Sequence, residues 1–166
     1  MISNNRSSRA LWRGLIVAGL VAGATSVASV AAFAGECPAN KIVADGQGQK
    51  QVATEPVGVA DTVLASIDLA EQKVALNDRL FRIRRLEIQP GGVVPWHDHA
   101  DRPALIYILQ GEITEYASNC AAPILHKAGE VSRDADLSHW WKNTGNNAVV
   151  LISADILHDK KEEHMM

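Results

Sequence analysis

Alternation of apolar and polar residues from about position 60 onward predicts a series of short β-strands. The clearest strands are expected at 80–88 (LFRIRRLEI), 104–116 (ALIYILQGEITEY, bent at Gly111) and 148–156, with shorter ones at 62–69, 123–126, 130–132 and 139–142. Turn-forming residues at 90–92 (PGG), 127–129 (KAG) and 143–146 (NTGN) separate them. Strands of this spacing are typical of a sandwich or a barrel, although 62–69 also fits a short helix.

The strand at 80–88 contains a break in its alternation. Its apolar positions change phase between Ile83 and Leu86, which predicts a β-bulge near Arg84-Arg85. Such a bulge could turn one guanidinium group inward, where it would hold an anion. The ordinary expectation for an arginine is a solvated place on the outer face, and we expect that here.

The first 34 residues have the order of a secretory signal peptide. Arg6, Arg9 and Arg13 come first without any acidic residue, an apolar run follows, and Ala32-Phe33-Ala34 precedes Gly35. We expect cleavage before Gly35 and a periplasmic or secreted protein with no stable membrane span. An uncleaved anchor is the alternative, because the apolar run approaches the ~20 residues that cross a bilayer. The small residues in the run favour cleavage.

The remaining chain is expected to form one domain. Residues 35–60 are polar and lack a steady period, so they predict an N-terminal arm, while 61–157 would form the β-domain and 158–166 (HDKKEEHMM) a charged tail. The leader carries three arginines and no acid, so its removal shifts the formal charge from −3 to −6. Nucleic acid is therefore not an expected partner.

Two cysteines, Cys37 and Cys120, would meet an oxidising compartment after export. A disulfide between them would tie the arm to the turn region at 117–123. Closing so long a loop would stabilise the fold by about 4.5 kcal/mol in the chain-entropy model. Two free buried thiols are the alternative.

Candidate chemistry gathers in the stretch from 90 to 111. His97-Asp98-His99 places two imidazoles one residue apart, and in an extended segment this spacing turns both rings to the same side. Neutral imidazoles in an apolar setting suit a transition metal. His139, at the start of HWWKN, offers a third nitrogen.

These residues resemble a known pair of motifs. Gly91, then His97-x-His99, then a strand ending in Gly111 is similar to the first conserved motif of the cupins, and Gly129 followed by His139 and Asn143 is similar to the second. The resemblance covers roughly 80–154 and is greatest to small single-domain cupins grouped with quercetin-dioxygenase-like proteins. It implies an all-β, antiparallel double-sheet barrel of the jelly-roll type, with a metal held by His97, His99 and His139.

One position departs from the cupin pattern. Cupins usually carry a glutamate seven residues before the closing glycine, and this chain has Ala104 there. Asp101 is the candidate extra ligand, whereas Glu115 lies on the order of 35 Å away along an extended strand and makes a poor substitute. By strand alternation, Ala104, Ile106, Ile108 and Trp141 are expected to line a pocket beside the metal.

Three functions remain open at this point. The first is an exported metal-dependent oxygenase, such as a dioxygenase, acting on a small chelating molecule of phenolic or diketone type. The second is a non-catalytic module in which a metal organises a small-ligand binding or sensing site. The third is a metal-free structural domain.

The cofactor and the partners follow from the first two functions. Imidazole ligands accept iron, zinc, copper, nickel or manganese, and iron is favoured because dioxygen chemistry needs a redox ion. The expected partner is a small-molecule ligand. The resemblance also implies a homodimer formed through strands outside the barrel.

Overall fold

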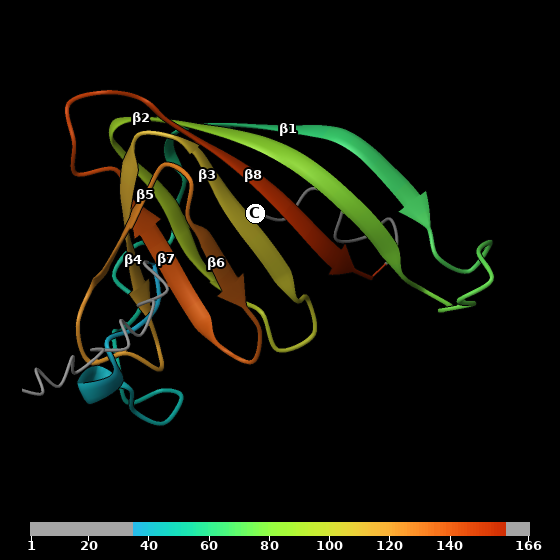
Figure 1. Ribbon diagram of the computed structural model, residues 1–166, viewed down its shortest axis with the longest axis horizontal. Coiled ribbons are helices and arrows are strands. Elements are labelled where there is room, and N and C mark those ends of the chain that lie inside the picture. The colour runs from blue at the N-terminus through green and yellow to red at the C-terminus, as the bar shows by residue number, and fades with distance from the viewer. Residues whose placement is uncertain (1–34, 159–166) are drawn as a thin grey trace, which may run out of the picture. The chain divides into compact units, whose positions relative to one another are not determined.

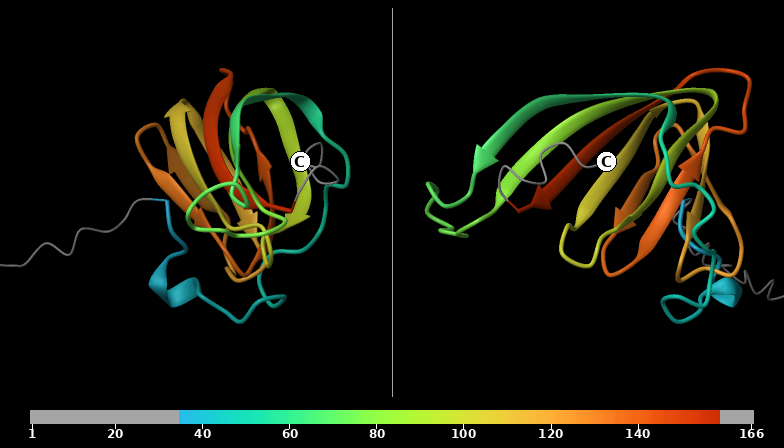
Figure 2. Two further views of the ribbon diagram at one scale, coloured as in Figure 1. Left: turned by 90° about the vertical axis from the view of Figure 1, so that its right-hand side faces the viewer. Right: turned by 180° about the vertical axis from the view of Figure 1, so that it is seen from behind.

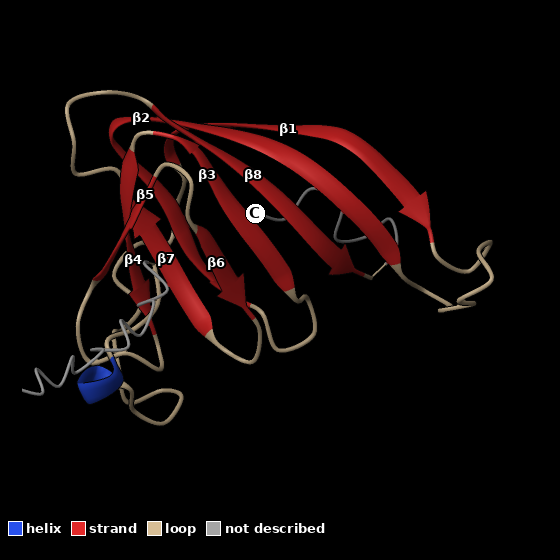
Figure 3. Ribbon diagram, in the orientation of Figure 1, coloured by secondary structure: helices blue, strands red, loops and turns tan. Residues whose placement is uncertain are grey.

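The computed structural model describes residues 35–158, which contain eight β-strands and one short 3-10 helix (Figures 1 and 3). The predicted signal peptide and all but the first residue of the predicted tail lie outside these residues. The elements are η1 (Ala39–Lys41), β1 (Val57–Asp68), β2 (Leu80–Asp98), β3 (Ala104–Gln110), β4 (Glu112–Ala117), β5 (Ile124–Lys127), β6 (Val131–Asp134), β7 (Ser138–Lys142) and β8 (Val149–Leu157). Within 35–158 no helix is long and apolar enough to span a bilayer.

The strands form one antiparallel sheet that curls into a nearly closed barrel of the jelly-roll type, as the sequence predicts (Figure 1). Their order is β5-β4-β7-β2-β8-β3-β6, and β1 pairs with β2 outside this path. The 19-residue β2 organises the sheet. Its first half pairs with β1 and β8, and its second half pairs with β7.

The predicted bulge near Arg84-Arg85 is wrong, because the irregularity lies on the neighbouring strand. From Leu80 to Ile88, β2 pairs with β8 without any register shift. The shift occurs in β1 between Val63 and Ala65, which leaves Leu64 as the extra residue. The segment at 62–69 is a strand, as favoured over a helix.

The apparent phase break in β2 comes from two arginines that face inward, against the ordinary expectation. Arg82 and Arg84 are 1% and 6% exposed. Arg82 donates from Nε and Nη2 to Asp155 at 3.1 and 2.8 Å, and Arg84 donates to Asp61 and, at 3.4 Å, to Asp155. Paired carboxylates make these buried charges tolerable, so Arg82, Arg84, Leu86 and Ile88 share one inner face.

Gly111 divides the strand predicted at 104–116 into two. Its φ of +82° reverses the path of the chain, and a Cβ there would lie 3.1 Å from Val149 Cγ2. On one side of Gly111, β3 pairs with β8 and β6. On the other side, β4 pairs with β7 and β5, so the reversal carries the chain across the barrel.

The apolar core fills the barrel from several strands. Its buried members are Leu86, Ile88, Val94, Ile106, Ile108, Ile113, Trp141, Val149 and Leu151. Burying a large aliphatic side chain of this kind contributes about 1.5–3 kcal/mol, which fixes the inner face of each strand. Inward polar residues beside this core are therefore held in defined places.

The predicted disulfide is confirmed, and the free-thiol alternative is wrong. Cys37 and Cys120 are bonded, with Cα atoms 5.8 Å apart. The arm continues along the loop after β4: the N–H of Val43 donates to Asn119 O at 2.9 Å, and that of Gly48 donates to Ser118 O at 2.6 Å. Figure 2 shows this arm, coloured blue to teal, against the loop ends of the barrel.

Candidate metal centre

The barrel brings the three predicted histidines together. His97 lies near the end of β2 opposite His139 of β7, and His99 follows β2 directly. The three ring centroids are 4.6–4.8 Å apart. One ring nitrogen from each lies within 4.8 Å of the others.

Each imidazole is oriented by a contact at its Nδ1. His97 Nδ1 lies 2.8 Å from Pro95 O, His99 Nδ1 lies 2.6 Å from Arg102 O, and His139 Nδ1 lies 2.6 Å from Glu115 Oε1. All three partners are acceptors, so each Nδ1 donates a proton and each Nε2 carries a lone pair. This is the tautomer that a metal ligand requires.

The inward-facing nitrogens fit a bound cation. His97 Nε2 and His139 Nε2 are 3.1 Å apart, and His99 Nε2 is buried without a hydrogen-bond partner. Two lone pairs at this distance repel each other unless a proton or a metal cation lies between them. Trp141 Nε1 also donates to His139 Nε2, at 3.3 Å. Tetrahedral ligands with metal–nitrogen bonds of about 2.0–2.1 Å would be about 3.3 Å apart, close to the separation observed.

Burial keeps two of the imidazoles neutral. Desolvation lowers the pKa of His97 well below 6.5 and that of His99 to about 3, and the neighbouring His139 lowers both further. Burial also opposes the charged form of His139, but Asp134 and Glu115 outweigh it and raise the pKa of His139. Neutral His97 and His99 are ready to bind a cation over most of the pH range.

Glu115 is a functional residue that the sequence analysis misjudged. It is 2% exposed, and its two carboxylate oxygens accept from His139 Nδ1 at 2.6 Å and from His126 Nε2 at 2.8 Å. The 35 Å estimate assumed one extended strand, whereas Gly111 reverses the chain and places Glu115 opposite Trp141. Its alternation with Ile113 and Ala117, which face inward, could have indicated that Glu115 faces inward too. Glu115 is thus a positioning residue for His139.

Asp101 does not take part in this centre. Its side chain is 67% exposed, and it pairs with Arg79 at 2.8 Å and with His158 on the surface. The expectation of an extra ligand at Asp101 is therefore wrong.

Carboxylates from neighbouring strands flank the alanine at the usual glutamate position. Ala104 pairs in register with Asp134 of β6 and Asp155 of β8. Asp155 is neutralised by the two arginines, but Asp134 Oδ2 is buried without a partner, 3.9 Å from His139 Nε2. Burial raises the pKa of Asp134 to about 6. Asp134 is the unneutralised acid nearest to the triad among the described residues.

A cavity of about 20 Å³ adjoins the triad, enough for roughly one water molecule. Its lining includes two of the predicted residues, Ile106 and Trp141, while Ala104 and Ile108 are buried elsewhere in the barrel and do not line it. Arg84 lines it as well, and its Nε is buried without a hydrogen-bond partner; the sequence analysis considered an inward guanidinium at Arg84-Arg85 but favoured a solvated one. The full lining is Arg84, Leu86, Val94, His97, His99, Ile106, Trp141 and Leu151.

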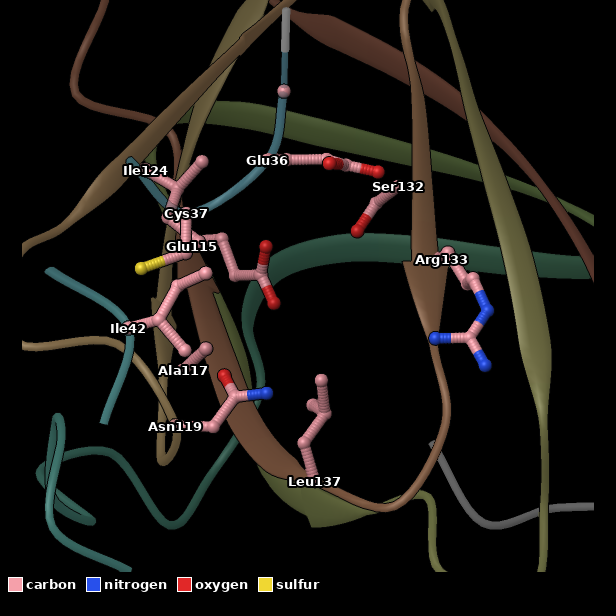
Figure 4. A pocket seen from close by; sticks show the side chains of 11 residues that line it. Glu36, Cys37, Ile42, Glu115, Ala117, Asn119, Ile124, Ser132, Arg133 and Leu137 are labelled. Atoms are coloured by element: carbon pink, nitrogen blue, oxygen red, sulfur yellow. The ribbon is translucent and has the colours of Figure 1, made fainter. Parts of the chain in front are cut away.

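A larger pocket of about 250 Å³ lies on the far side of Glu115 (Figure 4). Figure 4 shows Glu36 and Cys37 of the arm beside Glu115 of β4 and opposite Ser132 and Arg133 of β6. The arm therefore contributes to a pocket that shares Glu115 with the histidine centre.

Comparisons with known proteins give a consistent family. The family model described as "Cupin domain" matches residues 84–155. No curated protein matches the chain. Among solved structures, the chain is similar to a predicted oxalate decarboxylase from Thermotoga maritima, with 23% identity, a TM-score of 0.49, and coverage of 74% of this chain and 98% of that one.

Two further structures show the range of the similarity. One is an oxalate oxidase in complex with the substrate analogue glycolate, with 22% identity, a TM-score of 0.47, and coverage of 63% of this chain and 57% of that one. The other is the Cnp3 cupin domain of Schizosaccharomyces pombe, with 19% identity, a TM-score of 0.47, and coverage of 66% and 72%. At these levels the similarity says nothing about reaction or ligand.

Proposed function

The chain belongs to the cupin superfamily, and on that premise we propose that it is an exported metal-dependent oxygenase for a small chelating molecule. The observation that carries the proposal is the set of three Nε2 lone pairs directed at one another, each fixed by an acceptor at the opposite ring nitrogen. His97, His99 and His139 would hold a divalent transition metal. Iron is favoured over zinc, copper, nickel and manganese because a redox ion supplies dioxygen chemistry.

Three neutral ligands leave open positions for a chelating substrate and dioxygen. In the superfamily pattern a glutamate would fill one of them, but Ala104 leaves it free. The nearest unneutralised carboxylate, Asp134, has its Oδ2 3.9 Å from His139 Nε2, a separation that two ligands of one ion can have. The low ligand charge therefore favours an anionic substrate that binds as a ligand itself.

The cavity wall supports the same substrate class. Arg84 lines the space beside the triad and its buried Nε has no hydrogen-bond partner, so a negatively charged oxygen within reach of it would gain a charge-assisted hydrogen bond. The apolar side chains of Ile106, Trp141 and Leu151 would exclude bulk water. A space of about 20 Å³ holds roughly one water molecule, so the lining must open to admit even a compact diketone-like anion, and it must open further for a large phenolic compound.

A non-catalytic binding or sensing module is the second candidate. The cavity lining contains no carboxylate, so none of the lining residues is an acid–base catalyst of that type. A site that only holds a metal and a small anion needs no such group. The two functions differ in turnover, not in metal content.

The proposed assembly is a homodimer through β1. This strand lies at an edge, and within 35–158 it pairs only with β2. It exposes Val57, Val63, Leu64 and Ile67 by 42–56%. A long, apolar edge strand offers unpaired backbone groups to a second copy. Sedimentation of wild type and a Leu64→Lys variant would test this, with a monomeric wild type contradicting the proposal.

The function is tested by metal content and oxygen uptake. Elemental analysis of the mature, untagged protein should find about one transition metal ion per chain, and the His97→Ala/His99→Ala variant should lose it. Oxygen uptake by the iron-loaded protein is then measured against a panel of diketones and phenols. Uptake with a compact diketone supports the oxygenase, binding without uptake supports the second candidate, and a metal-free wild type contradicts both.

A further inference from the structure

We propose that cleavage before Gly35 creates a structural group: the new α-ammonium docks between His126 and Glu130 and completes a hydrogen-bond chain to the metal ligand His139. The inference rests on the proposed export and metal site. It concerns the arm side of Glu115, where Gly35, Glu36 and Cys37 line the larger pocket.

The first support is the space around Gly35. A Cβ built on this residue would lie 2.8 Å from His126 Nδ1 and 3.3 Å from Glu130 Oε2. For a carbon atom 2.8 Å is a clash, but for an ammonium nitrogen it is a hydrogen-bond distance. After cleavage, a turn of about 120° about the Cα–C bond moves the amino nitrogen into this same tetrahedral position.

The second support is an orphaned nitrogen at the receiving end. His126 is fully buried, and its Nδ1 has no hydrogen-bond partner while Gly35 is part of an uncut chain. An unpaired buried acceptor costs about 1–3 kcal/mol. The α-ammonium carries three protons, so it can donate to His126 Nδ1 and to Glu130 together.

Glu130 is already in position to receive that charge. Its Oε2 accepts the backbone N–H of Lys127 at 2.8 Å, which fixes the carboxylate near Gly35. The arm is fixed as well, because the Cys37–Cys120 disulfide lies two residues after Gly35. The new terminus therefore has little freedom to leave.

The docked group would stabilise the tautomer of His126 that its contact with Glu115 requires. A donor at Nδ1 requires the ring proton on Nε2, which then donates to Glu115 Oε2 at 2.8 Å. The other oxygen of Glu115 accepts from His139 Nδ1 at 2.6 Å, and this leaves the His139 Nε2 lone pair for a metal. The chain therefore runs from the α-ammonium through His126 and Glu115 to His139.

The uncleaved protein lacks this series of hydrogen bonds. The Gly35 nitrogen is then an amide with one proton, and His126 Nδ1 stays unpaired. Ionised Glu115 keeps the ring proton of His126 on Nε2, so the Nδ1 lone pair then stays buried without a donor and the His126–Glu115 contact lacks the support of the ammonium. Cleavage would thus couple export to a fully formed metal centre.

The test compares two exported chains that differ by one residue. The first begins at Gly35, as N-terminal sequencing should show, and the second carries an alanine inserted before Gly35, which displaces the ammonium. In the metal-free proteins we expect the α-amine of the first to react with an acylating reagent about tenfold more slowly, as one charged hydrogen bond implies. Glu130→Gln should remove this protection, while Glu112→Gln, at an exposed position of β4, should retain it.

Metal affinity gives the second measurement. Chelator competition should show that the alanine extension weakens metal binding by about tenfold, the effect expected when a ligand's supporting contacts are lost. Equal acylation rates, or a start other than Gly35, would overturn the docking. Equal metal affinity would overturn the link to His139. If neither chain binds metal, the proposed function fails, and the acylation rates still decide the docking.

Discussion

Replacing Glu115 with glutamine tests whether its hydrogen bond to His139 Nδ1 supports metal binding. The carboxylate accepts two hydrogen bonds, from His139 at 2.6 Å and from His126 at 2.8 Å, and is 2% exposed. Glutamine has the same shape but only one accepting oxygen. If its NH₂ group faced His139, the proton of that ring would move to Nε2 and block the metal. We therefore expect the amide oxygen to face His139 and the NH₂ group to face His126.

The expected loss of metal affinity follows from the hydrogen bonds that His139 and His126 keep in that orientation. His139 keeps an acceptor but loses an anionic one, and a charged hydrogen bond of this kind is worth about 1.5–3 kcal/mol. His126 must move its proton to Nδ1. We expect metal affinity to fall by about 10–100-fold, the range typical of a lost supporting contact.

Competition with a coloured chelator at pH 7 measures this loss directly. Glu112→Gln is the matched control, since it makes the same substitution on the same strand at an exposed position. Circular dichroism and urea unfolding would establish that both variants are folded. An affinity of folded Glu115→Gln within twofold of wild type would refute the role assigned to the carboxylate.

Three further predictions follow from the same structure. His97→Ala/His99→Ala should lose the bound metal while His158→Ala, at a surface site, retains it by elemental analysis. In the metal-free protein the pKa values of His97 and His99 are lowered, so the folded chain excludes protons that the unfolded chain binds below pH 6.5. Its unfolding free energy in urea should therefore fall as pH drops from 6.5 to 4.5, by about 1.4 kcal/mol per pH unit for each proton that only the unfolded chain binds. Below about pH 6, Asp134 offsets one of these protons, because its raised pKa lets the folded chain bind a proton there. A stability that rises over this interval would contradict the assignment. Cys37→Ser/Cys120→Ser should cost about 4.5 kcal/mol in the same assay, and a loss below about 1 kcal/mol would show that the cross-link is dispensable.

The sequence was sufficient for the strands and for the three histidines because both depend on local spacing. Two side chains separated by one residue share a face of any extended segment, whatever the rest of the chain does. His97 and His99 therefore needed only the strand that the alternation predicts. His139 needed the motif resemblance, since its approach depends on the register between β2 and β7.

The errors arose where pairing partners decide the outcome. The preference of arginine for solvent predicts an outer place for Arg82 and Arg84, and only the facing Asp155 and Asp61 make their inward place tolerable. In the same way, Gly111 reverses the chain and brings Glu115 to His139. Both facts concern residues far apart in sequence, which a pattern within one strand cannot supply.

Because position 104 is an alanine, the buried acidic residues near the centre lie on neighbouring strands and not at the usual glutamate position. Asp155 is neutralised by the paired arginines, and Glu115 is bound to two imidazoles, so neither is free to bind an ion. Asp134 alone among these buried acids keeps an unpartnered oxygen, and it lies 3.9 Å from His139 Nε2. A cation at the triad would therefore be attracted by Asp134 through a low-dielectric interior, and the 3.9 Å separation also allows Asp134 to act as a ligand. The open ligand position suits a substrate that binds through its own oxygen atoms, whereas the carboxylate of Asp134 attracts the cation but repels an anionic substrate.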